Sequence, residues 1–134
     1  MTIHSATFRV SFGDCDPAGL VFYPNFFAWL DATFHGFLAD KAGGHGTLCK
    51  TLGAKGIGLV SAQSDFHVPV TDGDDLSIAL SEIDWDRRRF TLRYEGQVRE
   101  RTVFKGCETR ALFVIEDGRI RAGDLSDLRN ILEN

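Results

Sequence analysis

The sequence predicts an α+β fold in which an antiparallel sheet wraps around one long central helix. Two observations carry this prediction. An unusually apolar helical segment runs from Pro24 to about Ala42, and strand-like segments rich in Val, Ile, Phe and Thr fill residues 57–116. The chain contains no repeat, linker or low-complexity stretch, so we expect its 134 residues to form a single domain, residues 1–134.

The first strand and the helix follow from local patterns. Residues 7–12 alternate apolar and polar side chains, which is typical of a half-buried strand, and a loop with glycine and proline follows. Pro24 suits the first turn of a helix, because the amide hydrogen that it lacks would have no intrahelical acceptor there. Gly43 and Gly44 mark the end of this helix.

Apolar side chains cover most of the circumference of this helix, so we expect other structure to surround it rather than solvent. They are Phe26, Phe27, Trp29, Leu30, Phe34, Phe37 and Leu38. Residues 45–53 are ambiguous, and a short helix is one interpretation of them.

The second half of the chain predicts a meander of strands. Turn signals separate the strands, which we place at residues 57–68, 75–85, 89–99 and 102–116. Strands joined by short turns are antiparallel neighbours. The last residues, 124–134, fit a short amphipathic helix. Such a sheet leaves an edge exposed, so we expect dimerisation edge to edge.

Composition excludes several classes of function. The net charge of −4 argues against general nucleic-acid binding, which needs a basic surface. The longest apolar runs have five residues, too few to span a membrane, and the N-terminus lacks the features of a signal peptide. The three cysteines are far apart and form no CxxC motif, and no histidine pair has metal-ligand spacing. We therefore expect a cytoplasmic protein without a metal, and no membrane or nucleic-acid partner.

Asp14 and Asp16 lie in the loop after the first strand. An aspartate before proline commonly closes a turn with its side chain, which is the simpler interpretation of Asp16. The alternative is catalytic: this loop leads to the N-terminus of an apolar helix, where backbone amides can stabilise a carbonyl oxygen that develops negative charge. Cys15 is a poor nucleophile between two acids, because neighbouring carboxylates oppose thiolate formation.

Asp31 shares a helix face with Phe27, Phe34 and Leu38. An unpaired buried carboxylate costs several kcal/mol, so this side chain needs a partner, a proton or water. It either bonds to the backbone or an arginine, or it recognises a polar group on an otherwise apolar ligand. His35, one turn later, is a candidate i,i+4 partner.

Arg87, Arg88 and Arg89 occupy the turn between two predicted strands. Charge clusters in turns are usually only solvated. A guanidinium group nevertheless matches phosphate geometry, so these arginines are also candidates to bind a phosphorylated ligand.

In the first third of the chain, FGDCDPAG (12–19), YPN (23–25) and WLDA (29–32) resemble the 4-hydroxybenzoyl-CoA thioesterase family of hotdog-fold proteins. VS (60–61), Phe66, DD (74–75) and WDRRR (85–89) follow in the order expected for that family, so the resemblance covers most of the chain. It implies a hotdog fold, with the long helix inside a curled sheet, and association into dimers that pair again into tetramers.

The resemblance also implies roles. Asp16 would be the catalytic carboxylate, as nucleophile or as general base, and the backbone amide of Tyr23 would polarise the thioester oxygen. Asp31, supplied by the partner subunit, would accept a hydrogen bond from a ring hydroxyl. The other substrate-binding residues would be Phe22, Phe26, Phe27 and Ser61, and the CoA-binding residues would be Arg87, Arg88 and Arg89. No cofactor is implied, and the partner would be an acyl-CoA substrate.

The sequence departs from the family pattern at Phe22 and at Phe26-Phe27, which make the acyl pocket more apolar. Benzoyl, a hydroxybenzoyl isomer or a related aryl group therefore stay open as the acyl group. The alternatives are a thioesterase for short-chain acyl-CoA or acyl-carrier-protein substrates, and a non-catalytic acyl-CoA-binding hotdog protein. A hotdog hydratase needs a histidine near the start of the helix, and none lies between His4 and His35.

Overall fold

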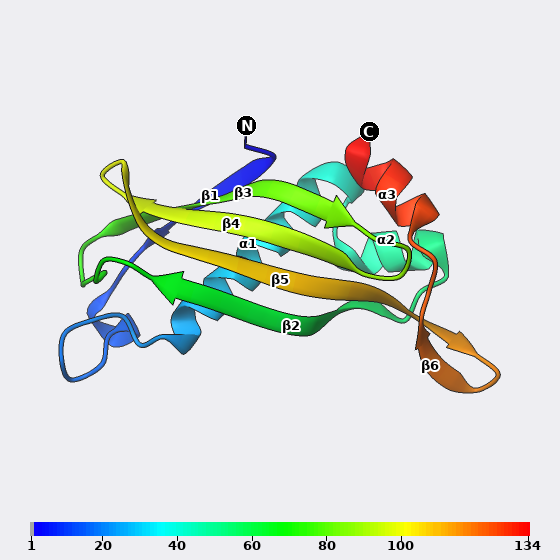
Figure 1. Ribbon diagram of the computed structural model, residues 1–134, viewed down its shortest axis with the longest axis horizontal. Helices are drawn as coiled ribbons and strands as arrows, with labels where there is room; N and C mark the ends of the chain where they lie inside the picture. The colour runs from blue at the N-terminus through cyan, green and yellow to red at the C-terminus, as the bar shows by residue number, and fades with distance from the viewer. Residues whose placement is uncertain (1) are drawn as a thin grey trace.

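The computed structural model describes residues 2–134, which form one sheet and three α-helices (Figure 1). Met1 lies outside the described residues. In chain order the elements are β1 (His4–Arg9), a 3-10 turn (Phe12–Asp14), α1 (Pro24–Ala42), α2 (His45–Leu52), β2 (Gly56–Phe66), β3 (Asp75–Trp85), β4 (Phe90–Val98), β5 (Arg101–Glu116), β6 (Arg119–Ala122) and α3 (Ser126–Glu133).

The sheet has the strand order β1-β3-β4-β5-β2, and β6 pairs with the far end of β5. Every strand pair is antiparallel. Helix α1 runs diagonally across one face of the sheet, and α2 and α3 pack beside its C-terminal half (Figure 1). Among residues 2–134, no helix combines the length and the apolar character needed to cross a bilayer.

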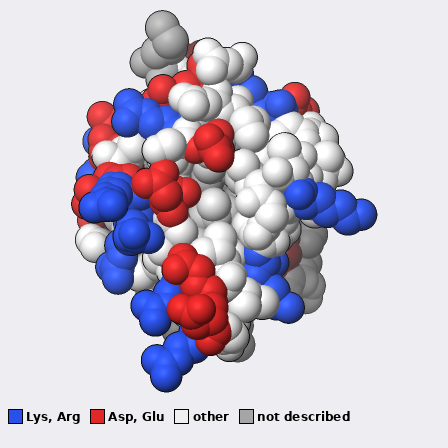
Figure 2. Space-filling view, turned by 90° about the vertical axis from the view of Figure 1, so that its right-hand side faces the viewer, with Lys and Arg blue, Asp and Glu red and all other residues white. Residues whose placement is uncertain are grey.

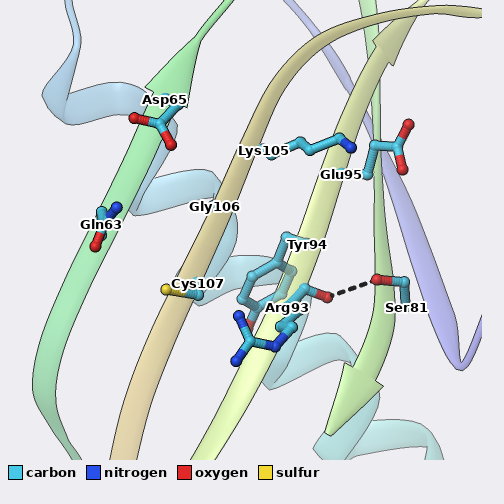
Figure 3. Close-up of a pocket in the computed structure, with 9 residues that line it drawn as sticks. All are labelled: Gln63, Asp65, Ser81, Arg93, Tyr94, Glu95, Lys105, Gly106 and Cys107. Atoms are coloured by element: carbon cyan, nitrogen blue, oxygen red, sulfur yellow. Dashed lines mark hydrogen bonds between the residues drawn. The ribbon is translucent and has the colours of Figure 1, made fainter.

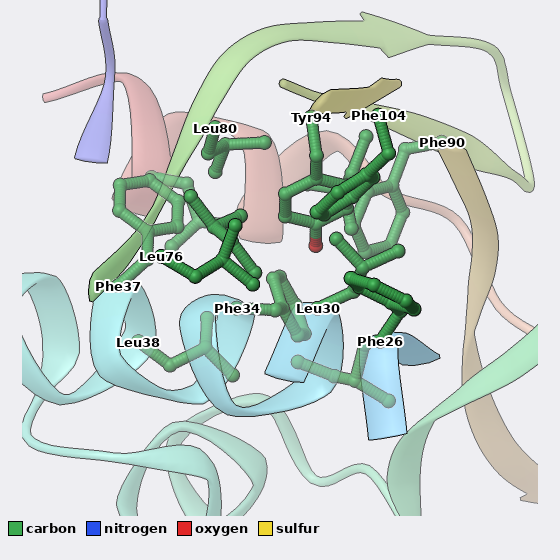
Figure 4. Close-up of a cluster of buried hydrophobic side chains, with 14 of the residues drawn as sticks. Phe26, Leu30, Phe34, Phe37, Leu38, Leu76, Leu80, Phe90, Tyr94 and Phe104 are labelled. Atoms are coloured by element: carbon green, nitrogen blue, oxygen red, sulfur yellow. The ribbon is translucent and has the colours of Figure 1, made fainter. Parts of the chain in front are cut away.

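The core lies between α1 and the inner face of the sheet (Figure 4). Helix α1 contributes a face whose side chains are buried: Phe26, Leu30, Thr33, Phe34, Phe37 and Leu38. Residues such as Leu76, Phe90 and Phe104 meet this face from the strands. Each fully buried apolar side chain of this size contributes about 1.5–3 kcal/mol to the free energy of folding.

The opposite face of α1, which includes Asp31 and Ala32, is exposed in the single chain. The expectation that other structure surrounds the helix is therefore only half met, because the sheet covers α1 from one side.

The predicted α+β architecture is confirmed, and the predicted bounds of α1 and β3 match the observed ones. Residues 45–52 form a helix, which settles the ambiguous segment. The first strand was placed too late: β1 ends at Arg9 because its partner β3 begins at Asp75, opposite Arg9. Strand β6 was not predicted. The turn at Asp117-Gly118 returns the chain along β5, with backbone φ angles of 52° and 75° that suit a two-residue hairpin.

Candidate active site

The loop that carries Asp16 is closed by backbone hydrogen bonds. Asp16 N donates to Leu20 O at 2.8 Å, and Phe22 N donates to Asp14 O at 2.9 Å. Within this loop Asp16 Oδ1 accepts hydrogen bonds from Ala18 N at 2.9 Å and from Leu20 N at 3.4 Å. The carboxylate therefore closes its own turn, as the simpler interpretation predicted. No donor from residues 2–134 binds Oδ2, so the same side chain keeps one oxygen available for chemistry.

The start of α1 is joined to this loop. Asn25 Nδ2 donates to Asp14 O at 2.8 Å, and the amides of Asn25 and Phe26 donate to Phe22 O and Tyr23 O. Pro24, at the first position of the helix, has no amide hydrogen to donate. Within the described residues the amide of Tyr23 makes no hydrogen bond, so it is the free donor of this helix end.

A groove of about 410 Å³ opens beside the loop and the start of α1. Its lining is mostly apolar and consists of Leu20, Val21, Tyr23, Phe26, Phe66, His67, Val68, Pro69 and Val70. Phe22, 51% exposed, is in contact with Tyr23. Phe27 is half-buried on α1, and Ser61 is exposed on β2, opposite Thr109 of β5. The structure thus places Tyr23 and Phe26 in one groove next to the Asp16 loop, whereas Phe27 and Ser61 lie outside its lining.

Asp31 has an arginine partner. Asp31 Oδ1 accepts a hydrogen bond from Arg110 Nη2 at 2.8 Å, and His35 Nε2 lies 3.5 Å from the same oxygen. The expected i,i+4 contact with His35 is therefore present. The ring of His45 lies 5.4 Å from that of His35, and His45 Nε2 accepts from Ile57 N at 3.0 Å. Burial lowers the pKa of His45, and the nearby charges of His35 and Arg110 lower it further.

Arg110 belongs to a buried polar group that the sequence analysis missed. It donates to Glu108 through Nε at 3.2 Å and through Nη2 at 3.1 Å, and its guanidinium lies 4.4 Å from the ring centre of Phe34. Tyr94 Oη donates to Glu108 Oε1 at 2.7 Å. Burial and the Glu108 carboxylate raise the pKa of Tyr94, so Tyr94 keeps its proton and remains the donor.

The arginine turn lies far from Asp16. Residues 86–89 connect β3 to β4 at one end of the longest axis of the molecule, whereas the Asp16 loop lies at the other end (Figure 1). The 11 residues of β3, which lie between these two ends, span roughly 33 Å. A single chain therefore does not bring Asp16 and the three arginines together.

Acidic groups accompany these arginines. Arg88 Nη1 donates to Ala122 O at 2.8 Å, which ties the turn to the end of β6. Hydrogen bonds from Ser126, and more weakly the charges of Arg87 and Arg88, lower the pKa of Asp124. Figure 2 shows this end of the molecule, where basic and acidic side chains lie side by side around a neutral area. A groove of about 310 Å³ here is lined by Trp85, Asp86, Arg87, Asp124, Leu125, Ser126 and Arg129.

Another hollow, of about 300 Å³, lies on the outer face of the sheet (Figure 3). Its side chains are mainly polar, and Arg93 at its rim pairs with Asp84 at 2.9 Å and with Glu82 at 3.3 Å. None of the predicted site residues lines it. Among the residues that the structure describes, no group of His, Cys, Asp and Glu side chains is arranged to hold a metal.

A comparison with curated proteins finds a clear relative. The 4-hydroxybenzoyl-CoA thioesterase of Pseudomonas sp. (strain CBS-3) is 34% identical to the chain over an alignment of 125 positions, and the match covers 85% of this chain and 85% of that protein. The chain belongs to the 4-hydroxybenzoyl-CoA thioesterase family. No family model matches the chain.

Solved structures agree with this membership. A 4-hydroxybenzoyl-CoA thioesterase mutant in complex with 4-hydroxybenzoyl-CoA superposes with a TM-score of 0.80, at 28% identity over 96% of each chain. A gentisyl-CoA thioesterase superposes with a TM-score of 0.76, at 29% identity over 93% of this chain and 98% of its own. The predicted hotdog fold and the predicted class of enzyme, an acyl-CoA thioesterase, are confirmed.

Proposed function

We propose that the protein hydrolyses an aryl-CoA thioester, such as 4-hydroxybenzoyl-CoA or benzoyl-CoA, to the free acid and CoA, with Asp16 as the catalytic carboxylate. The observation that carries the proposal is the loop at the start of α1. It holds a carboxylate with one unengaged oxygen, joins it to a helix end with a free Tyr23 amide, and places both beside an apolar groove.

These groups would supply a nucleophile or base and a hydrogen-bond donor to the thioester oxygen. The Tyr23 amide would donate to the thioester oxygen and stabilise the negative charge that develops there. Asp16 Oδ2 would either attack the carbonyl carbon, expelling CoA thiolate and leaving a mixed anhydride for water to cleave, or remove a proton from the attacking water. Single-turnover hydrolysis in heavy-oxygen water tests the first route, because label that enters Asp16 must pass through the anhydride.

An aromatic acyl group fits the site best. The groove is lined mainly by apolar side chains and has an aromatic wall formed by Phe26 and Phe66, and Phe22 and Phe27 would complete the acyl site. The relatives of known structure act on hydroxylated aryl groups, 4-hydroxybenzoyl in one case and gentisyl in the other. Asp31 and Ser61 would be further substrate-binding residues, with Asp31 supplied by the partner subunit.

We also propose a dimer that forms through the free edge of β2. Leu59 and Val60 are 51% and 40% exposed, and β5 is the one strand that pairs with β2 in the described chain. An unpaired strand edge that carries exposed apolar side chains favours pairing with another strand. Antiparallel pairing of β2 with its copy creates a two-fold axis that reverses the long axis of the molecule. The partner's arginine turn would then lie at the same end as this chain's Asp16 loop.

This arrangement accounts for the separation of Asp16 from the three arginines. Arg87, Arg88 and Arg89 of the partner would bind the phosphates of CoA whose thioester lies at this chain's Asp16. Further pairing of dimers would give the tetramer.

The experiment that tests the proposal is a panel of thioesters assayed with the wild type and with Asp16→Asn. We expect hydrolysis of aryl-CoA substrates to exceed that of butyryl-CoA, and Asp16→Asn to lower kcat by about 10²–10⁴-fold while CoA binding persists. Asp14→Asn is the matched control, because Asp14 Oδ2 instead accepts from Ser11 N and Oγ.

The alternatives give different results. Preferred hydrolysis of butyryl-CoA or of acyl-carrier-protein thioesters would replace the aryl substrate by a short-chain one. Binding of acyl-CoA without hydrolysis by the wild type would indicate a non-catalytic binding protein. Hydrolysis by Asp16→Asn at a rate close to that of the wild type would exclude Asp16 as the catalytic group.

A further inference from the structure

A buried chain of hydrogen bonds leads from the sheet to the exposed face of α1. Tyr94 Oη donates to Glu108, Glu108 accepts two hydrogen bonds from Arg110, and Arg110 donates to Asp31. The side chains of Glu108 and Arg110 are 2% and 3% exposed, whereas that of Asp31 is 53% exposed. Figure 4 shows the hydroxyl of Tyr94 pointing into the apolar cluster, and the Tyr94 side chain is buried. This series of hydrogen bonds therefore reaches the surface at one end, which is Asp31.

The contacts of Asp31 are one-sided. Arg110 Nη2 at 2.8 Å and His35 Nε2 at 3.5 Å both approach Oδ1. No donor from residues 2–134 binds Oδ2, and the exposed side chain leaves that oxygen open to a ligand. A guanidinium fixed by two bonds to Glu108 holds the Asp31 carboxylate in one orientation, because Arg110 cannot rotate without depriving the buried Glu108 carboxylate of its cation.

We propose that Arg110 is a positioning residue that fixes Asp31 so that Oδ2 accepts one hydrogen bond from a ring hydroxyl of the acyl group. The inference rests on the proposed function, in which Asp31 contacts the acyl ring bound by a neighbouring subunit. Arg110 itself touches no substrate. Its part is to turn a flexible surface carboxylate into a rigid acceptor.

The arrangement defines the class of acyl group. A carboxylate paired with a guanidinium has only acceptor capacity left, so it binds a donor such as a phenolic hydroxyl. A ring methoxy group offers no donor, and a ring carboxylate would be repelled by the charge of Asp31. Glu108 and Asp31 together carry one negative charge more than Arg110, which further disfavours an anionic ring substituent. The arrangement therefore favours an acyl ring with a hydrogen-bond donor, such as a hydroxyl, over a ring ether or a ring carboxylate.

The test compares two substrates in each variant. The measured quantity is the ratio of kcat/KM for the best of the three hydroxybenzoyl-CoA isomers to kcat/KM for benzoyl-CoA, so a general loss of activity cancels. A hydrogen bond to a charged acceptor predicts a ratio of about 10 to 100 for the wild type, mainly through KM because the hydroxyl is remote from the thioester. Asp31→Asn should bring the ratio close to 1.

The decisive variant is the double substitution Arg110→Met with Glu108→Gln, which removes the guanidinium without leaving an unpaired buried carboxylate. We expect its ratio to fall as far as that of Asp31→Asn. Adding Asp31→Asn to it should lower the ratio no further, because both changes abolish the same interaction. Arg110→Lys keeps a buried cation for Glu108 and thus preserves the fold. Its single ammonium group no longer bridges the two carboxylates, so the ratio of kcat/KM for hydroxybenzoyl-CoA to that for benzoyl-CoA should fall at least about threefold.

The outcomes separate the two proposals. If the wild type hydrolyses aryl-CoA with a high ratio and both Arg110 variants keep that ratio, the positioning role is wrong and the proposed function stands. A wild-type ratio close to 1 also overturns the positioning role alone. If the wild type hydrolyses no aryl-CoA, the proposed function fails and the inference fails with it.

Discussion

Replacing Gly96 by alanine should disturb the acyl groove from the sheet. Gly96 of β4 lies opposite Phe104 of β5, and the Phe104 ring covers the glycine. A Cβ at position 96 would lie 2.1 Å from Cε1 and 2.5 Å from Cδ1 of that ring. Ordinary carbon–carbon contact is about 3.5–4.0 Å, so the ring has to move by roughly 1.5 Å.

Phe104 has no free space in which to move. It is fully buried, and its ring centre lies 5.1 Å from that of Phe26 and 6.4 Å from that of Phe66. Overpacking of this kind lowers the free energy of unfolding by about 1–3 kcal/mol. Alanine offsets about 0.4–1 kcal/mol of this loss, because it has less conformational freedom than glycine in the unfolded chain. We therefore expect Gly96→Ala to lower the free energy of unfolding by about 1–2 kcal/mol. Because Phe26 and Phe66 line the groove, KM for aryl-CoA should rise as well.

Urea unfolding measures this change in the free energy of unfolding, and two other glycines provide controls for it. In Gly58→Ala the new Cβ would lie at the same 2.1 Å from the Phe113 ring. Phe113 is only half-buried and can turn toward solvent, so the loss in the free energy of unfolding should be smaller. Nothing lies within 4 Å of a Cβ at Gly46 in α2, so Gly46→Ala should stabilise the protein by up to about 1 kcal/mol. If Gly96→Ala unfolds at the same urea concentration as Gly46→Ala, with the same m-value, the packing argument is refuted.

Two further variants test how stability depends on pH. Because the pKa of Tyr94 is raised above 10, the unfolded chain releases this proton at a lower pH than the folded protein does. The free energy of unfolding should therefore keep its full contribution from Tyr94 below about pH 10 and fall by up to about 1.4 kcal/mol per pH unit above it. The fall should be smaller in Tyr94→Phe. Urea midpoints at pH 9 and pH 11 check this, and an equal loss in both proteins would contradict it. Because the pKa of His45 is lowered below 6.5, the unfolded chain takes up this proton first, so stability should fall as the pH drops below about 6.5. His45→Gln keeps an acceptor for Ile57 N and should flatten the fall in Tm between pH 7 and pH 5; a variant curve parallel to that of the wild type would refute the assignment.

Local signals predicted most of the fold. Helix α1 has proline at its first position and glycine after its last, and these marks depend only on neighbouring residues. Strand β1 was misplaced because the alternation continues to Phe12, whereas its end is set by β3, more than 60 residues away. Strand β6 contains only four residues, and the Asp117-Gly118 turn before it was the one signal of a strand that returns along β5.

The candidate site was predicted unevenly for the same reason. The Asp16 loop is a continuous segment, so its motif could be found in the sequence. The partner of Asp31 could not, because Arg110 lies 79 positions away. A signal was nevertheless present in β5, where the period of two places Glu108 and Arg110 on the same inward face as Phe104 and Leu112. Two opposite charges on a buried strand face indicate an internal ion pair.

The position of the Asp16 loop and the arginine turn at opposite ends of the longest axis has a genetic consequence in the proposed dimer. Each catalytic centre would take its acid from one copy and its phosphate-binding arginines from the other. Two inactive alleles, one lacking Asp16 and one lacking the three arginines, would therefore complement each other in a mixed dimer. One of the two centres would then combine both defects, and the other would be intact. Half of the sites in such a heterodimer would work, although neither parent protein would.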